Sequence, residues 1–117
     1  HLDEHLVNAY ADVVLDHSPL HVDDEYAKGA AWGRRVVHGM LLTSHFSSVV
    51  GMLLPGKRAL LVSTDFDYVQ PVFVGETVTF SARVIQVDQA RSLLRLSCLV
   101  LRTHEICSRG TALAEVR

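Results

Sequence analysis

The N-terminal part of the chain has the hydrophobic period of an amphipathic helix. Apolar side chains recur there at three- and four-residue spacing, at Leu2, Leu6, Val7, Tyr10, Val13 and Val14. This spacing predicts a helix that ends near Leu15. Pro19 disfavours the helical conformation for the residue before it, so we expect residues 16–21 to form a turn at the helix end.

Residues 36–54 form the most apolar segment of the chain. They follow a short helix expected over residues 23–28, which Gly29 stops. The apolar segment has hydrophobic side chains around most of its circumference, so as a helix it would have to be buried on nearly all sides. We therefore expect a central helix, closed by the Pro-Gly pair at residues 55–56.

After Gly56 the hydrophobic period changes from that of a helix to that of a strand. Apolar residues alternate with others in four stretches, which are interrupted at residues 71–75, 88–92 and 105–110. This pattern predicts four long antiparallel strands. The alternating apolar positions include Leu60, Val62, Phe66, Val78, Phe80, Ala82, Leu94, Leu96, Cys98, Ala112, Ala114 and Val116.

An apolar helix followed by antiparallel strands has one economical packing, in which the sheet curls around the helix and buries it. We therefore predict an α+β fold with a curved antiparallel sheet wrapped around a central helix. The chain has no internal repeat or linker, so residues 1–117 are expected to form one domain. Such a small sheet would leave an edge strand and an apolar outer face, which a second copy could cover, and we expect a homodimer.

Composition excludes several classes of partner. The formal net charge of -2 over 117 residues gives no electrostatic basis for binding nucleic acid or an anionic membrane. The longest uncharged apolar run, residues 40–55, is short for a membrane span and is interrupted by polar residues. Cys98 and Cys107 lie in neighbouring predicted strands without metal-ligand spacing, and we expect buried free thiols in a reducing cytoplasm.

Asp16 and His21 are the first candidates for chemistry. The turn at Pro19 places a carboxylate and an imidazole close enough to share one water molecule. Such a pair can add water across an activated double bond or remove it, because one group takes a proton while the other orients or returns it. The alternative is a capping Asp and a surface His, which are ordinary in any turn.

His38 and Gly39, at the start of the apolar helix, are the second candidate. A glycine there lets a ligand approach the backbone, and its N–H lies at the positive end of the helix dipole, where it can polarise a carbonyl oxygen. The alternative is a glycine selected for tight packing. Ser47, two turns along, could face the same cavity, with Val50 one turn further; hydrogen bonding of the helix serines to helix carbonyls is the alternative.

The remaining histidines and the basic residues near the helix suggest no site of their own. His1, His5, His17, His45 and His104 have no metal-binding pattern, so no metal is expected. Most of these histidines are interpreted as surface residues, and His45 as a core or interface residue. Four basic residues could meet phosphate groups, but most are expected to be simply solvated: Arg34, Arg35, Lys57 and Arg58.

Three segments together resemble the MaoC-like (R)-specific enoyl-CoA hydratases, which have the hot-dog fold. Asp16-x-Ser-Pro-Leu-His21 is similar to the hydratase motif Asp-x-Asn-Pro-Leu-His. Residues 37–42, Val-His-Gly-Met-Leu-Leu, match the start of the family's central helix. Residues 68–78 match its strand-turn-strand signature, with Tyr68 where Phe is typical. The three segments occur in the family's order and extend over most of the chain.

The resemblance implies reversible syn addition of water to a trans-2-enoyl thioester carried by CoA or acyl carrier protein, without a cofactor. Asp16 and His21 would activate the water, and the Gly39 N–H would bind the thioester oxygen. The substrate pocket is then expected to include Ser18, His38, Met40, Ser47 and Val50.

The chain differs from the family pattern in two places. Ser18 stands where the family usually has Asn, and the family's usual strand before the first helix is not evident. A non-catalytic subunit that binds acyl thioesters is an alternative function. A thioesterase is another, although it would normally need a carboxylate on the central helix, and no Asp or Glu lies between His38 and Leu54.

Overall fold

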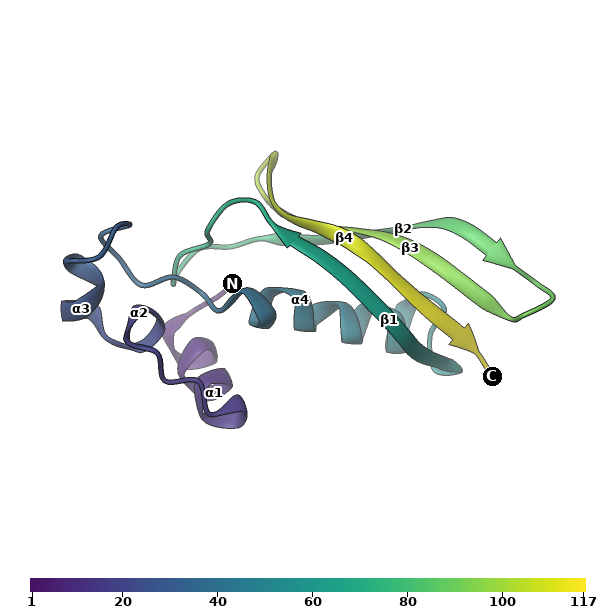
Figure 1. Ribbon diagram of the computed structural model, residues 1–117, viewed down its shortest axis with the longest axis horizontal. Helices are drawn as coiled ribbons and strands as arrows, with labels where there is room; N and C mark the ends of the chain where they lie inside the picture. Colours follow the sequence, from purple (N-terminus) through teal and green to yellow (C-terminus); the bar gives the residue numbers. More distant parts are fainter.

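The computed structural model describes residues 1–117 as a layer of helices against one antiparallel sheet (Figure 1). The sheet lies over the long helix α4, while α1, α2 and α3 gather near the N-terminal end of α4. The helical elements are α1 (Glu4–Val14), α2 (Pro19–Val22), α3 (Asp24–Lys28), α4 (Gly39–Ser48) and a π-helical turn, η1 (Val49–Leu53). The strands are β1 (Ala59–Tyr68), β2 (Thr79–Asp88), β3 (Leu93–Arg102) and β4 (Glu105–Val116).

The four predicted strands form one antiparallel sheet in the order β1-β4-β3-β2. Its register places Ala82, Cys98, Gly110 and Phe66 in one row across the sheet. Side chains alternate between faces along each strand, so this row and every second row face α4. The core between the sheet and α4 is formed mainly by Leu41, Leu42, Phe46, Val50, Leu96, Cys98, Val100, Ala112 and Ala114.

The central helix is buried on one face only, which corrects the prediction that it is buried on nearly all sides. The sheet covers Leu42 and Phe46, whereas Met40, Met52 and Leu53 are 71%, 76% and 74% exposed. A single four-stranded sheet reaches only one side of a helix, so the remaining apolar side chains stay open in one copy of the chain (Figure 1).

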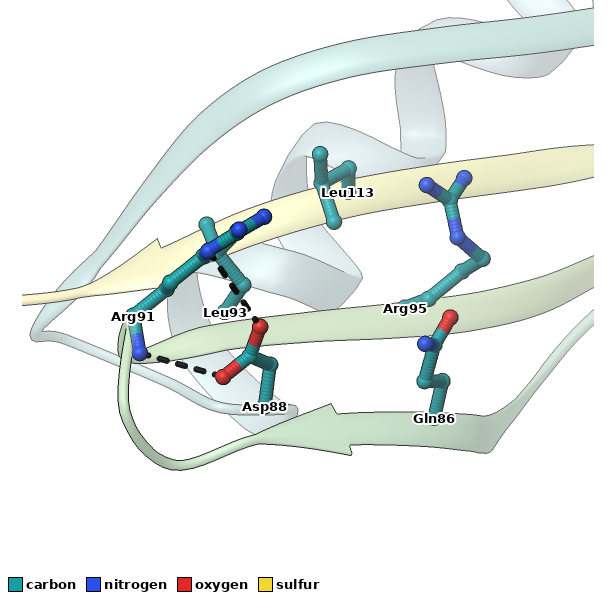
Figure 2. A pocket seen from close by; sticks show the side chains of 6 residues that line it. All are labelled: Gln86, Asp88, Arg91, Leu93, Arg95 and Leu113. Carbon is teal, nitrogen blue, oxygen red and sulfur yellow. Dashed lines mark hydrogen bonds and ion pairs between the residues drawn. The ribbon is translucent and has the colours of Figure 1, made fainter.

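The outer face of the sheet is polar, and the expectation of an apolar outer face is wrong. A pocket of about 240 Å³ on this face is lined by Gln86, Asp88, Arg91, Leu93, Arg95 and Leu113, and Figure 2 shows their side chains standing on β2, β3, β4 and the turn between β2 and β3. Charged and polar residues alternate with the core residues along these strands, which is the usual pattern of a half-solvated antiparallel sheet.

Two of the predicted breaks differ from the structure. The turn expected at residues 16–21 is only partly a turn: α1 already ends at Val14, and Pro19 is the first residue of α2, a position at which a missing backbone N–H costs no hydrogen bond. The break expected at residues 105–110 is wrong, because the turn lies at Thr103–His104 and β4 begins at Glu105. Gly110 lies within β4, where a glycine is required because a Cβ atom would be only 1.9 Å from the Asp65 carbonyl oxygen.

Other sequence-based expectations are confirmed. The first helix ends at Val14 with Leu15 as its left-handed cap, and α3 ends at Lys28 before Gly29. Cys98 and Cys107 are buried free thiols on β3 and β4. No helix combines the length and the hydrophobicity that crossing a membrane would require.

Candidate active site

Asp16 lies just beyond the end of α1, in the segment that leads to α2. Its Oδ1 accepts two hydrogen bonds from Ser18, one from the backbone N–H at 3.1 Å and one from the hydroxyl at 2.5 Å. These bonds hold the pKa of Asp16 below its ordinary value, the hydroxyl having the larger effect. Ser18 therefore anchors one carboxylate oxygen with two donors, while Oδ2 makes no bond to Ser18.

Replacing Ser18 by Ala is expected to raise the pKa of Asp16 towards its ordinary value of 3.8, because the hydroxyl donor is the largest cause of the lowering. A group with a lowered pKa in the folded state stabilises the fold above its unfolded pKa, and that contribution is lost as the pH falls. The variant should therefore show a smaller loss of stability on acidification. The carboxyl ¹³C shift of Asp16, followed against pH, measures the pKa directly.

Ser48→Ala is the control for this titration, because Ser48 is exposed on α4 and its hydroxyl contacts Met52 and not Asp16. An Asp16 titration that is identical in wild type and Ser18→Ala would contradict the role assigned to the Ser18 hydroxyl.

The His21 ring is held by a hydrogen bond from one of its nitrogens. It is part of the single turn of α2, and its Nδ1 lies 2.6 Å from the carbonyl oxygen of Val36. A carbonyl can only accept, so Nδ1 carries the proton in this contact and Nε2 of the neutral ring keeps a lone pair. This nitrogen is the one that can bind or activate water.

His38 packs against the His21 ring and is hydrogen-bonded to Asp16. Its side chain is 3% exposed, its ring stacks on that of His21 with the centroids 4.0 Å apart, and Tyr10 packs edge-on against it. His38 Nε2 donates to the backbone carbonyl of Asp16 at 3.1 Å and is 3.9 Å from Asp16 Oδ2. Burial lowers the pKa of His38, which favours a neutral ring. His38 thus ties the Asp16 backbone to the His21 ring.

Gly39 begins α4, and its backbone N–H has no acceptor within the chain. The first N–H groups of a helix have no intrahelical partner, and they lie at its positive end. A Cβ at Gly39 would lie 2.9 Å from Cε1 of Tyr68, so the packing explanation for this glycine holds as well. Tyr68 is a site residue that the sequence placed only in a strand motif; its hydroxyl is 3.1 Å from Thr43 Oγ1.

His21 and Gly39 open onto the same cavity, whose volume is about 480 Å³. Ligand atoms of Asp16, His21 and His38 lie within 4.8 Å of one another, so the Asp16 carboxylate is close to His21, although Asp16 itself does not line this cavity. Most of the wall is apolar, as in pockets for small organic ligands. The other lining residues are Trp32, Val36, Val37, Leu42, Tyr68, Val69, Gln70, Pro71 and Val72.

None of the five residues expected in the pocket lines this cavity: Ser18 and His38 bond to Asp16 instead, and the other three lie elsewhere. Ser47 and Met40 line a second cavity of about 220 Å³, together with Tyr10 and Phe66 among others. Val50 is 2% exposed and belongs to the core. Eight residues of α-helix turn through about 800°, which leaves Ser47 about 80° away from the direction of Gly39. The alternative of bonding to helix carbonyls holds for Ser44, whose hydroxyl donates to Leu41.

The cluster of Asp16, His21 and His38 has the distances of a metal site but not the free lone pairs. His38 Nε2 and His21 Nδ1 both carry protons in their bonds to carbonyl oxygens. The other nitrogen of His38, Nδ1, is buried without a partner. Only Asp16 and His21 can then offer ligand atoms to the cavity, whereas protein metal sites normally use three or four ligands.

Two residues outside the cluster differ in their surroundings. His17 is a surface residue, as expected, and pairs with Asp12 at 2.8 Å. Arg35, expected among the mainly solvated basic residues, is instead buried and bonded to the backbone carbonyl of His21.

Comparison with known proteins shows the family to which the chain belongs. A family model described as a MaoC like domain matches residues 1–96. An (R)-specific enoyl-CoA hydratase of Aeromonas caviae is 37% identical over 108 residues, which cover 92% of this chain and 76% of that protein. A mitochondrial 3-hydroxyacyl-[acyl-carrier-protein] dehydratase of Arabidopsis thaliana is 31% identical over 100 residues, 84% of this chain and 59% of that protein.

A solved structure of a hydratase has the same fold. An (R)-hydratase from Aeromonas caviae superposes with a TM-score of 0.96 at 30% identity, covering 100% of this chain and 89% of that one. The helix and four-stranded sheet are therefore those of the hot-dog fold, as the sequence predicted. The chain belongs to the MaoC-like family of hydratases and dehydratases.

Proposed function

We propose that this chain catalyses the reversible addition of water to a trans-2-enoyl thioester, giving the (R)-3-hydroxyacyl thioester. One observation supports this most directly: the Asp16 carboxylate lies beside the His21 ring, and His21 and Gly39 line the same cavity. The first two can hold and activate a water molecule, and the unpaired N–H of Gly39 can receive a thioester oxygen.

In the proposed reaction, the water is held between Asp16 and the free Nε2 of His21. One of these groups takes a proton as the water oxygen bonds to the β-carbon of the substrate. Electron density then moves onto the thioester oxygen, where the Gly39 N–H and the dipole of α4 stabilise the enolate. The Asp16–His21 pair then returns the proton taken from the water to the α-carbon on the same face, which completes the addition without a cofactor.

The thioester carrier is proposed only as CoA or acyl carrier protein. Relatives named for each carrier match this chain, the Aeromonas caviae enzyme for CoA and the Arabidopsis thaliana enzyme for acyl carrier protein. The buried free thiols suit a reducing compartment, and we propose the cytoplasm.

A thioesterase is less well supported by the structure. The cavity wall contributed by α4 offers Gly39 and Leu42, and neither α4 nor η1 contains a carboxylate that could serve as base or nucleophile. The hydratase proposal needs no acidic residue on the helix, because Asp16 comes from the segment before α2.

Hydration of crotonyl-CoA, followed by the loss of absorbance of its conjugated enoyl thioester, tests the proposed function. We expect the absorbance to fall, with (R)-3-hydroxybutyryl-CoA as the product identified by chiral analysis. Release of free CoA without hydration would support a thioesterase instead. Binding of crotonyl-CoA with no turnover would favour a non-catalytic subunit, and either result would overturn the proposal.

We also propose that the chain forms a homodimer through strand β1. This strand is an edge of the sheet and exposes three successive apolar side chains, Leu60, Leu61 and Val62. Leu61 shares the second cavity with Met40 of α4, so the edge adjoins the uncovered face of the helix. A second copy would pair with the open strand edge and cover these apolar residues.

The substitution Val62→Glu is expected to convert the dimer to a monomer, because it places a charge at the proposed contact. Size-exclusion chromatography with light scattering should give twice the chain mass of 13.0 kDa for the wild type and about that mass for the variant. Val87→Glu is the matched control, because Val87 is an exposed valine on β2, the opposite edge. A wild-type monomer, or dissociation by Val87→Glu and not by Val62→Glu, would contradict the proposed interface.

A further inference from the structure

Arg35 is a buried cation whose side chain is 4% exposed. Its guanidinium donates in three directions: Nε to the His21 carbonyl at 2.6 Å, Nη1 to Glu4 Oε1 at 3.1 Å and Nη2 to Asn8 Oδ1 at 2.8 Å. Burying a charge is unfavourable unless it is paired and hydrogen-bonded, and here both conditions are met. The planar fork of an arginine reaches these acceptors together, which a lysine cannot do.

These acceptors belong to two different elements. Glu4 and Asn8 are one turn apart on α1, while His21 belongs to α2. Arg35 itself lies in the segment that leads into α4, just before Val36. Arg35 therefore connects the first helix and the segment before α4 to the short helix that carries His21.

The short helix α2 depends on such outside support. It has four residues, and an isolated single turn of helix is not stable in water. Residues 35 and 36 hold it at three points: Arg35 Nε at the His21 carbonyl, the Val36 N–H at the Leu20 carbonyl, 3.2 Å away, and the Val36 carbonyl at the His21 ring. Both the backbone and the ring of His21 are thus fixed by two adjacent residues.

We propose that Arg35 is a positioning residue for His21: it fixes the backbone of α2 so that the His21 ring keeps its bond to Val36 and directs Nε2 into the cavity. This inference rests on the proposed hydratase function for its kinetic consequence. The structural consequence, a change in the state of the His21 ring, does not depend on that function.

Arg35→Met and Arg35→Lys test the proposal. A misplacement of about 1 Å in a catalytic group can cost about 10²-fold in rate. For crotonyl-CoA hydration we expect kcat to fall about 10²-fold in Arg35→Met and about tenfold in Arg35→Lys, which keeps the charge near Glu4. KM should change by less than about threefold, because Arg35 does not line the cavity.

The second measurement is a long-range ¹H–¹⁵N correlation spectrum of the histidine rings, at a pH where they are neutral. Wild type should show His21 in the Nδ1–H form required by its bond to Val36. In Arg35→Met we expect a mixture of the two neutral forms. A purely structural role for Arg35 would lower the unfolding temperature but leave the His21 signals of the folded protein unchanged.

Arg102→Met is the matched control. Arg102 is another partly buried arginine with several acceptors, Glu76, Glu105 and the Pro71 carbonyl, and it has no contact with His21. It should lose stability without any change in the His21 ring signals. Asn8→Ala removes one acceptor of Arg35 without touching His21 and should produce a weaker form of the Arg35→Met effect.

The outcomes separate this inference from the proposed function. Absence of hydratase activity in the wild type would overturn the function, while an altered His21 spectrum in Arg35→Met would still support positioning. An unaltered His21 spectrum in folded Arg35→Met, or an equal change in Arg102→Met, would overturn the positioning role. If Arg35→Met does not fold, Arg35→Lys and Asn8→Ala decide by the same signals.

Discussion

Replacing Asp16 by Asn is expected to lower kcat for crotonyl-CoA hydration about 10³-fold. Asparagine has nearly the same shape, and its amide oxygen can still accept the two hydrogen bonds from Ser18. It cannot be ionised or take a proton from water, so the loss falls on acid–base chemistry, for which a contribution of about 10²–10⁴-fold is typical. Initial rates with saturating substrate, compared at equal enzyme concentration, measure the effect.

Asp12→Asn is the matched control for this experiment. Asp12 is an exposed carboxylate near the end of α1, the helix that precedes Asp16, and it pairs with a histidine, His17. It is not part of the cluster of Asp16, His21 and His38, and its Asn variant should keep wild-type kcat. Substantial hydration by Asp16→Asn, or an equal loss in Asp12→Asn, would show that Asp16 does not perform the chemistry.

Replacing His21 by Ala is expected to lower kcat by about 10³-fold as well. The variant loses the free Nε2 at the cavity, and with it the second group that holds the water and exchanges protons. The effects of Asp16→Asn and His21→Ala should not add in the double variant, because both groups act on one water molecule in one step. Rates of the two single variants and the double variant measure this coupling.

His17→Ala is the control, because His17 is an exposed histidine four residues before His21 and is bonded only to Asp12. Since alanine also removes the ring that stacks on His38, the folded state of His21→Ala is checked by its unfolding temperature. His21→Gln provides a second variant with a polar side chain of similar reach. Wild-type kcat in either folded His21 variant would refute the proposed acid–base role.

The structure shows what Ser18 does at the motif position where the family usually has Asn. Ser18 stands in the turn that positions Asp16. The structure shows that Ser18 donates both its backbone N–H and its hydroxyl to one oxygen of Asp16. Its side chain does not cap α2, although Ser18 is at the capping position. The hydroxyl is thus used for the carboxylate and not for the helix.

Much of the fold could be predicted from the hydrophobic pattern. The first helix, expected to end near Leu15, ends at Val14, and the alternating segments correspond to the four strands. The alternation of apolar and polar residues did not predict the start of the fourth strand, because the break was expected to extend to Gly110. Gly110 is in fact required within β4 by the close approach of the β1 backbone, a contact between residues far apart in sequence.

The candidate site was predicted in part. Asp16, His21 and Gly39 carry recognisable spacing and motif signals, and the structure brings them to one region. Ser47 and Val50 were predicted to share a helix face with Gly39. The structure places Ser47 at the second cavity and Val50 in the core under the sheet, so neither reaches the cavity of His21 and Gly39. The role of Arg35 could not be predicted from the sequence. Its acceptors lie on α1 and α2, far from it along the chain, so in the sequence it looks like any basic residue before a helix.

By itself, the sequence determined most of the helix and strand segments, the alternation of apolar and polar residues along the strands, and which residues can exchange protons. These properties depend on neighbours along the chain and on side-chain chemistry. Only the tertiary structure decided that one face of α4 stays open, that Tyr68 packs on Gly39, and that Arg35 is bonded to His21. Each of these is a contact between distant segments, set by how the sheet and the first helices dock around α4.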